Sequence, residues 1–171
     1  NAAPSASSPN ALRDLLLFPL ICGLLAGLAF PPSAFWILGL LAWVPLLYSY
    51  SRCKWGFLPA FVAGVVFHGL TLYWIGLNSD PPPLLAAVSG TAAVLYLATL
   101  WGFGGTITVF LRKQWGLKAL WLWPAVVVWV DFLMEHSELG FPWAYAGITQ
   151  AVNPLLRPLL AVGGTHLLTL C

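Results

Sequence analysis

Charge is scarce in this sequence. Asp, Glu, Lys and Arg together make up 7% of its 171 residues, whereas hydrophobic residues make up 60% and the mean hydropathy is +0.88. Soluble domains average about 25% charged residues. This composition excludes a water-soluble fold, and a net charge of +2 spread along the chain excludes a nucleic-acid-binding surface.

Cysteine is scarce too. Cys22, Cys53 and Cys171 lie far apart in the sequence, without the paired spacing of a zinc site or a disulfide framework. We interpret them as small apolar residues in or near helices. We therefore expect no metal site, and no sequence motif indicates a cofactor.

Long apolar runs are what the chain has in abundance. A helix needs about 20 apolar residues to cross a bilayer, and the runs here are separated by prolines, glycines and basic connectors. The pattern predicts an all-α polytopic transmembrane helix bundle with five full spans and the start of a sixth. The predicted spans cover residues 15–30, 34–50, 56–77, 84–111, 119–134 and, truncated, 155–171.

The domain organisation is simple. Residues 1–11 are rich in Pro, Ser and Ala and are predicted to form a disordered tail, while residues 12–171 are predicted to form one transmembrane domain. The chain has no initiator Met and stops inside an apolar run, so we expect it to be a fragment of a longer protein.

Local patterns predict how the helices meet. Consecutive prolines break a helix, so Pro31 and Pro32 predict a tight turn between the first two spans. Gly23 and Gly27 form a GxxxG pattern, which permits close helix approach, and we expect it to serve packing within the chain rather than dimerisation. His68, inside the third span, is expected to be hydrogen-bonded within the bundle, with a proton relay as the alternative.

The distribution of charge predicts the orientation in the membrane. Cytoplasmic loops are enriched in Lys and Arg, so we expect a cytoplasmic N-terminus and an outward-facing loop at residues 140–143. One side of the predicted spans receives Arg13, Arg52, Lys54, Arg112, Lys113 and Lys118. The other side receives Asp80, Glu135, Glu138 and a single basic residue, Arg157.

The candidate site lies at the outer end of the fifth predicted span. Asp131 is placed where a carboxylate is costly without a partner or water. Glu135 and Glu138 follow one and two turns later, so the three acids share one face if the helix continues that far. One interpretation is solvated residues at the membrane interface. The other is an outward-facing pocket for a cationic or polar lipid head group, helped by His136 and Arg157.

An aromatic turn follows these acids. Proline fixes the backbone of Gly140-Phe-Pro-Trp143, and Trp143 and Tyr145 are placed either to anchor the chain at head-group depth or to wall a lipid-access cleft. No catalytic residue is predicted, because Cys22 and Cys171 sit in apolar runs where a thiolate is disfavoured. The predicted substrate-binding residues are Asp131, Glu138, Trp143 and Tyr145.

Several motifs occur in a fixed order along the chain. They are Gly27-Leu-Ala-Phe-Pro-Pro-Ser-Ala-Phe-Trp36, Tyr73-Trp74, Asp131-Phe-Leu, Gly140-Phe-Pro-Trp143, Gly147, Gln150 and Gly163-Gly-Thr-His-Leu-Leu168. Over about residues 15–171 they resemble the runs G-x-L-A-F-x-P-x-x-x-W, E-F-L-R, G-F-P-W, G-x-x-Q and G-x-x-x-x-x-L of the apolipoprotein N-acyltransferase family. One run departs from the family pattern, with Asp131 and Met134 in place of its Glu and Arg.

The resemblance implies a function that this chain would serve in part. In the family, a nitrilase-like domain on the outer face takes an acyl chain from a phospholipid through a Glu-Lys-Cys triad. It passes the chain to the N-terminal Cys amine of a diacylglyceryl-modified apolipoprotein. None of that triad maps to these residues, so the chain alone is expected to be inactive. The resemblance implies a bacterial inner-membrane protein, of which this part anchors the catalytic domain and shapes lipid access.

Two other functions stay open at this point. A small transporter would use Asp131, His68 and Glu135 as an ion path, although the apolar stretch from Leu120 to Val130 interrupts a continuous polar row. A purely structural membrane subunit would need no site.

Overall fold

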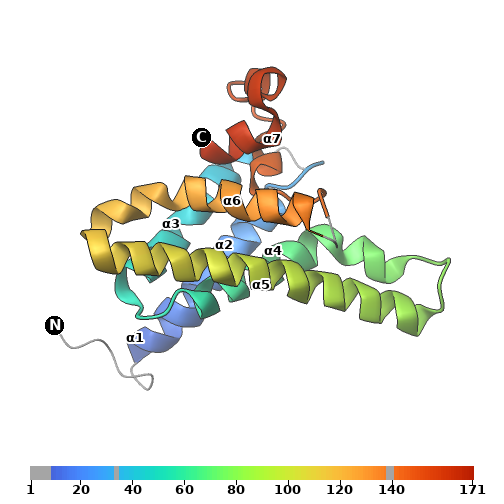
Figure 1. Cartoon of the computed structure of the whole chain (residues 1–171). Helices are drawn as coiled ribbons and strands as arrows, with labels where there is room; N and C mark the ends of the chain where they lie inside the picture. The colour runs from blue at the N-terminus through green and yellow to red at the C-terminus, as the bar shows by residue number, and fades with distance from the viewer. Residues whose placement is uncertain (1–8, 33–34, 138–140) are drawn as a thin grey trace.

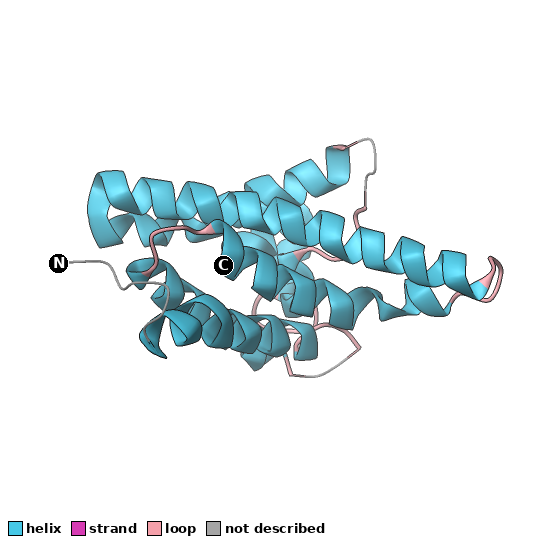
Figure 2. Ribbon diagram, turned by 90° about the horizontal axis from the view of Figure 1, so that it is seen from below, coloured by secondary structure: helices cyan, strands magenta, loops and turns pink. Residues whose placement is uncertain are grey.

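A computed structural model describes residues 9–32, 35–137 and 141–171 of the protein. Within these ranges every regular element is a helix (Figure 1, Figure 2), which confirms the predicted all-α class. The longer helices are α2 (Phe18–Leu28), α3 (Trp36–Arg52), α4 (Phe57–Leu72), α5 (Pro83–Trp115), α6 (Trp123–His136) and α7 (Leu160–Leu170). The short elements are α1 (Pro9–Leu12), the π-turn η1 (Arg13–Leu17) and the 3-10 turns η2 (Tyr73–Leu77), η3 (Gly116–Leu122), η4 (Ala146–Gln150) and η5 (Arg157–Leu159).

Two segments are long and apolar enough to cross a bilayer. Phe57–Leu77 comprises α4 and η2, and Pro83–His136 comprises α5, η3 and α6. In Figure 1, α6 turns back along α5 after η3, so the second segment is a hairpin rather than one straight helix. The helices at the other predicted spans are shorter, with 11 residues in α2 and 17 in α3. The number of membrane crossings therefore stays a prediction.

The helix boundaries follow the turn residues. Helix α2 ends at Leu28 and α3 begins at Trp36, so the chain turns at the proline pair as predicted. Helix α5 begins at Pro83, whose fixed φ suits the first turn of a helix. The N-terminal helical segment begins at Pro9, inside the stretch that was expected to be a disordered tail.

Small residues bring α2, α4 and α5 close together. A Cβ on Gly23 of α2 would lie 2.6 Å from the carbonyl oxygen of Ala63 on α4, and one on Gly64 of α4 would lie 2.9 Å from the Cα of Ala98 on α5. Gly27, the second glycine of the GxxxG pattern, also faces α4. The expectation that this pattern serves packing within the chain is confirmed.

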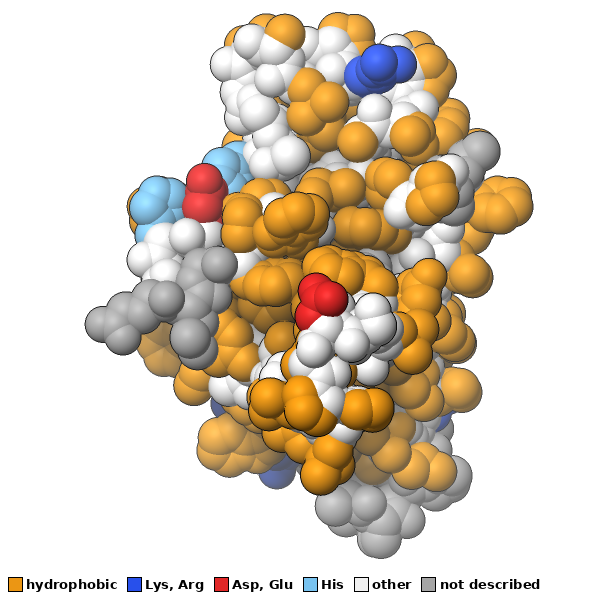
Figure 3. Space-filling view, turned by 90° about the vertical axis from the view of Figure 1, so that its right-hand side faces the viewer, with side chains coloured by type: hydrophobic (Ala, Val, Ile, Leu, Met, Phe, Trp, Pro, Cys, Tyr) orange, Lys and Arg blue, Asp and Glu red, His pale blue; other side chains and the backbone are white. Residues whose placement is uncertain are grey.

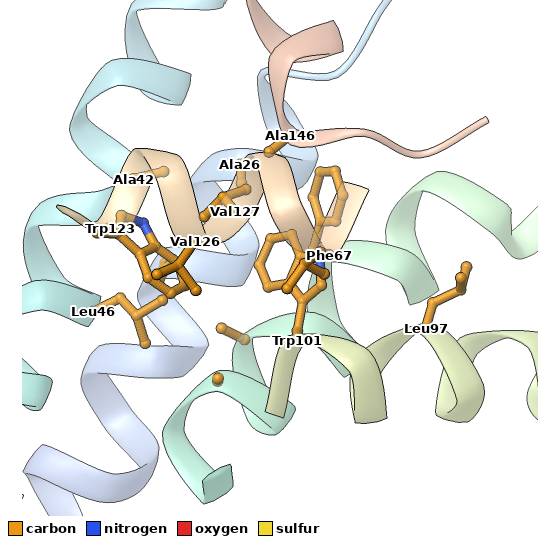
Figure 4. Close-up of a cluster of buried hydrophobic side chains, with 14 of the residues drawn as sticks. Ala26, Ala42, Leu46, Phe67, Leu97, Trp101, Trp123, Val126, Val127 and Ala146 are labelled. Carbon is orange, nitrogen blue, oxygen red and sulfur yellow. The ribbon is translucent and has the colours of Figure 1, made fainter. Parts of the chain in front are cut away.

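Aromatic rings fill the core between α3, α4, α5 and α6 (Figure 4). Phe67 stacks on Trp101 with ring centroids 5.1 Å apart, and Trp43 lies 5.6 Å from Trp101 and 5.7 Å from Trp123. His68 is fully buried beside Phe67 and Trp101, but neither ring nitrogen has a hydrogen-bond partner. The expected hydrogen bond of His68 is therefore wrong, and the ring contributes packing instead.

Arginine contacts tie together the end of the bundle that was predicted to face the cytoplasm. Arg52 donates to the buried carboxylate of Asp14 across 2.9 Å, and this hydrogen bond raises the pKa of Arg52. Arg112 donates to the carbonyl oxygens of Ser51 and Cys53 across 2.7 and 2.9 Å. The ends of α3 and α5 consequently meet at the left of Figure 1.

The segment expected to be a truncated sixth span is interrupted. Residues 151–156 are mostly in turns, η5 follows, and α7 leaves helical geometry at Gly163, with φ −140°, and at Gly164, with φ 62°. A φ of 62° lies in the left-handed region, which glycine adopts without steric cost. Helix α7 is thus short and bent, and the continuous helix expected from residue 155 does not form.

Candidate functional site

The last turn of α6 and the chain that follows it meet at one end of the bundle. Helix α6 ends at His136, and the Ser137 N–H donates to the carbonyl oxygen of Leu133. The chain then returns, and the Phe141 N–H donates to the carbonyl oxygen of Met134 across 2.9 Å. The aromatic turn therefore lies against the end of α6. Figure 3 looks onto this end of the molecule, where acidic and histidine side chains lie among largely hydrophobic surface.

Asp131 is fully buried and has its partner on α7. The Thr169 hydroxyl donates to Asp131 Oδ2 across 2.9 Å and accepts a hydrogen bond from the Gly147 N–H across 3.0 Å. A Cβ on Gly147 would lie 2.6 Å from Thr169 Oγ1, so this close approach requires glycine. Asp131 Oδ1 has no hydrogen-bond partner. One hydroxyl thus joins α6, η4 and α7.

Glu135, one turn further along α6, is paired with a histidine. His166 Nε2 lies 3.0 Å from Glu135 Oε2, and the ring of Tyr145 lies 5.5 Å from the ring of His166. Burial, and after it the negative charges of Glu135 and Asp131, raise the pKa of Tyr145 to about 12. We name these residues the α6–α7 polar cluster: Asp131, Glu135, Tyr145, His166 and Thr169.

The other predicted site residues that the structure describes form no hydrogen bond or ion pair with this cluster. Trp143 is 62% exposed, and its ring centroid is 6.2 Å from that of Trp74 in η2. Glu138 lies outside the described residues. His136 and Arg157 are exposed, and in the part of the chain that the structure describes neither forms an ion pair with an acidic residue. Of the four predicted substrate-binding residues, the structure brings Asp131 and Tyr145 together.

Two members of the cluster were missed from the sequence. His166 and Thr169 are three residues apart on α7 and therefore share one face, which is a visible signal. Their partners on α6 are 31 and 38 residues away in the sequence. That pairing depends on how α7 packs against α6, which helical periodicity does not predict.

The chemistry of the cluster is that of a hydrogen-bonding site. Two carboxylates, a phenol and an imidazole can hold a polar or cationic group, and none of them is an activated nucleophile. Among the described residues, no three His, Cys, Asp or Glu side chains are grouped so as to hold a metal ion. Nor does any hydrogen bond in the described ranges link His68 to Asp131 or Glu135, so an ion path through these three has no support.

Thr169 also lines a cavity of about 290 Å³ between α3, η3, α6, η4 and α7. The amide and hydroxyl groups of its wall are bonded within the protein, whereas the buried Nε1–H of Trp123, another lining residue, has no hydrogen-bond partner. Gln150 Nε2 donates to the carbonyl oxygen of Trp36 across 3.0 Å, and the Thr149 hydroxyl donates to that of Ala146 across 2.8 Å. No pattern along the chain predicts this cavity, because five separate elements enclose it.

The sequence profile of the apolipoprotein N-acyltransferase N-terminal domain matches residues 22–171. The apolipoprotein N-acyltransferase of Vibrio cholerae is 29% identical over 172 residues, which cover 94% of this chain and 34% of that protein. The one from Chromobacterium violaceum is 28% identical over 171 residues, which cover 97% of this chain and 33% of that protein. This chain thus spans about a third of the length of these relatives. Because the profile match includes most of the chain and the whole polar cluster, the chain belongs to the apolipoprotein N-acyltransferase N-terminal domain family.

Proposed function

We propose that this chain is the membrane-embedded N-terminal part of a lipoprotein N-acyltransferase. The reaction would transfer an acyl chain from a phospholipid to the N-terminal Cys amine of an apolipoprotein. The observation that carries the proposal is the family match over residues 22–171, which takes in every helix from α3 to α7. The acyl transfer itself would belong to an outward-facing catalytic domain that this part anchors.

The proposed topology is that of a multi-pass protein of the bacterial inner membrane with its N-terminus in the cytoplasm. Two helical segments suited to crossing a bilayer support it, and α2, α3 and α7 would supply the other spans. The arginine contacts gather at one end of the bundle, as cytoplasmic positive charge would require. Trp74 lies in η2, which follows α4 at the other end of the bundle, and Trp143 lies beside Trp74; a membrane interface favours tryptophan there.

Within this function, the polar cluster and the aromatic turn would shape how lipid reaches the catalytic domain. Asp131 and Tyr145 belong to this proposed cleft on the sequence pattern, although both are buried in the structure, and Trp143 would contribute its exposed aromatic rim. Glu138 belongs to the proposed cleft on the sequence pattern alone.

The test uses the natural protein that contains this chain, reconstituted in phospholipid vesicles with a diacylglyceryl-modified lipopeptide. We expect a labelled acyl chain to move from phospholipid to the Cys amine, and an intact protein that transfers none would overturn the proposed function. Trp143→Ala and Glu138→Ala are expected to raise KM or lower kcat. Trp115→Ala is the matched control, since Trp115 is 64% exposed at the opposite end of the bundle. Unchanged KM and kcat in the first two variants would remove both residues from the substrate site.

A further inference from the structure

We propose that the cavity between α3, α6 and α7 binds one hydrocarbon chain of a membrane phospholipid. The proposal rests on the function proposed above only in placing this chain in a bilayer. It concerns a site that is lined by other residues than the proposed cleft, and Thr169 alone is shared with the polar cluster.

The shape of the cavity suits an extended chain. Gly39, Leu40, Trp43, Val44 and Leu47 line it from α3, with the spacing of one helix face. From the first of these residues to the last, α3 rises about 12 Å, at 1.5 Å per residue. The cavity is therefore long in the direction of α3 for its volume of about 290 Å³.

The chemistry of the wall favours hydrocarbon over water. Thr149, Gln150 and Thr169 direct their hydrogen bonds to other protein groups. The Nε1–H of Trp123 has no partner, but one free donor is fewer than the two to four polar groups that hold a buried water molecule. Cavities of this kind stay dry and take up apolar molecules. An empty cavity also lacks dispersion contacts along its wall, and a lipid chain from the bilayer would restore them.

The exposure of the lining residues shows where the cavity opens. Leu40 and Val44 on α3 are 42% and 62% exposed and Trp121 on η3 is 87% exposed, whereas Trp123, Ala146 and Leu168 are at most 4% exposed. The opening therefore lies between the exposed faces of α3 and η3, and the floor is formed by α6, η4 and α7. A chain would enter sideways from the bilayer. We call Trp123, Ala146 and Leu168 the cavity floor.

The experiment is photo-crosslinking in vesicles of phosphatidylcholine that carry a diazirine in the middle of one acyl chain. The natural protein is irradiated, and the labelled residues are mapped by mass spectrometry. We expect adducts on the cavity floor, which lipid surrounding the protein cannot reach because these residues are buried. Val88, on α5 and 56% exposed, reports the surrounding lipid and should be labelled in every sample.

A filling variant and its control test whether the adducts come from the cavity. Val44→Trp narrows the opening, and we expect floor labelling to fall on the order of tenfold, as overfilling of a packed site predicts. Ile37→Trp places the same side chain on α3 at a residue that is 55% exposed and does not line the cavity. Floor labelling should be unchanged in that variant, and Val88 labelling should be unchanged in both.

An unlabelled floor beside a labelled Val88 in the unmodified protein would overturn the proposal, whether the cavity is empty or filled by protein. An equal loss of floor labelling in Val44→Trp and Ile37→Trp would overturn it too. Acyl transfer is measured in the same vesicles. Floor labelling without transfer supports this site and counts against the proposed function, whereas transfer without floor labelling overturns this site alone.

Discussion

Thr169 and Asp131 are joined by a 2.9 Å hydrogen bond that spans 38 residues of sequence. The bond sets a hydroxyl of α7 against a carboxylate that is fully buried in α6. The N–H of Gly147 donates to the same hydroxyl, so this group holds three elements in one arrangement.

Removal of that hydroxyl should destabilise the protein. Thr169→Val leaves the Asp131 carboxylate without its donor and the Gly147 N–H without its acceptor. Unsatisfied buried polar groups cost about 1–3 kcal/mol each. We expect a lower free energy of unfolding for Thr169→Val in detergent micelles and near wild-type stability for Thr169→Ser, which keeps the hydroxyl. Equal stability of the two variants would contradict a role for the hydrogen bonds.

Gly147→Ala should destabilise the protein through a steric clash. The added Cβ would meet the Thr165 carbonyl oxygen and Thr169 at less than contact distance. We expect a loss of about 1–3 kcal/mol, as for other overpacked sites. Gly69→Ala is the control, because a Cβ there has nothing within 4 Å and alanine favours a helix. A loss in Gly69→Ala as large as that in Gly147→Ala would contradict this explanation.

Gly23→Val should weaken the contact between α2 and α4 without changing the oligomeric state. The valine side chain would meet the Ala63 carbonyl oxygen and Val66, and we expect a loss of about 1–3 kcal/mol in thermal or chemical unfolding. Leu24→Val, at a half-exposed neighbour, should cost less. If light scattering showed that Gly23→Val dissociates an oligomer, the glycine pattern would also serve association between chains.

Arg112→Lys should loosen the end of the bundle where α3 and α5 meet. An ammonium cannot reproduce the two-pronged hydrogen bonding of the guanidinium to the carbonyl oxygens of Ser51 and Cys53. We expect a loss of about 1–2 kcal/mol, against none for Arg157→Lys on the exposed η5. Faster proteolysis around residues 51–56 in the first variant would provide a second measurement. Identical behaviour of the two variants would show that Arg112 is replaceable.

The phenol of Tyr145 should lose its proton at an unusually high pH. Its pKa is raised to about 12 from the ordinary value of 10.0, so the neutral phenol is favoured in the folded protein. The stabilisation is complete below pH 10 and is lost as the pH rises toward 12. The phenolate absorbance of wild type minus that of Tyr145→Phe should therefore rise near pH 12. Glu135→Gln should move this step to lower pH, and a step near pH 10 in the wild type would contradict burial beside two carboxylates.

The sequence was sufficient to predict the helical fold class, one of its turns and one close helix contact. Low charge and long apolar runs predict helices, and the proline pair at Pro31 predicts the turn between α2 and α3. Gly23 predicts a close helix contact because glycine has no side chain to keep a neighbouring helix away. Each of these inferences depends on neighbours along the chain.

Only part of the candidate site was predictable, because its contacts join residues that are far apart along the chain. Asp131 attracted notice because a carboxylate in an apolar run needs a partner, but the partner, Thr169, is an ordinary residue in another helix. His68 was expected to find a hydrogen bond, and the tertiary packing placed rings against it instead. The break within α7 was equally hidden, since a pair of glycines is compatible with a helix until the backbone is seen.

The break at Gly163 and Gly164 also changes what the two halves of the C-terminal segment share. A continuous helix transmits torque, so that a rotation at one end turns every side chain at the other. A left-handed glycine interrupts that transmission. Helical geometry therefore does not tie the orientation of residues 155–162 to that of His166 and Thr169, which hydrogen-bond to side chains of α6. We therefore expect substitutions or insertions in residues 155–162 to leave the contacts of His166 and Thr169 with α6 in place.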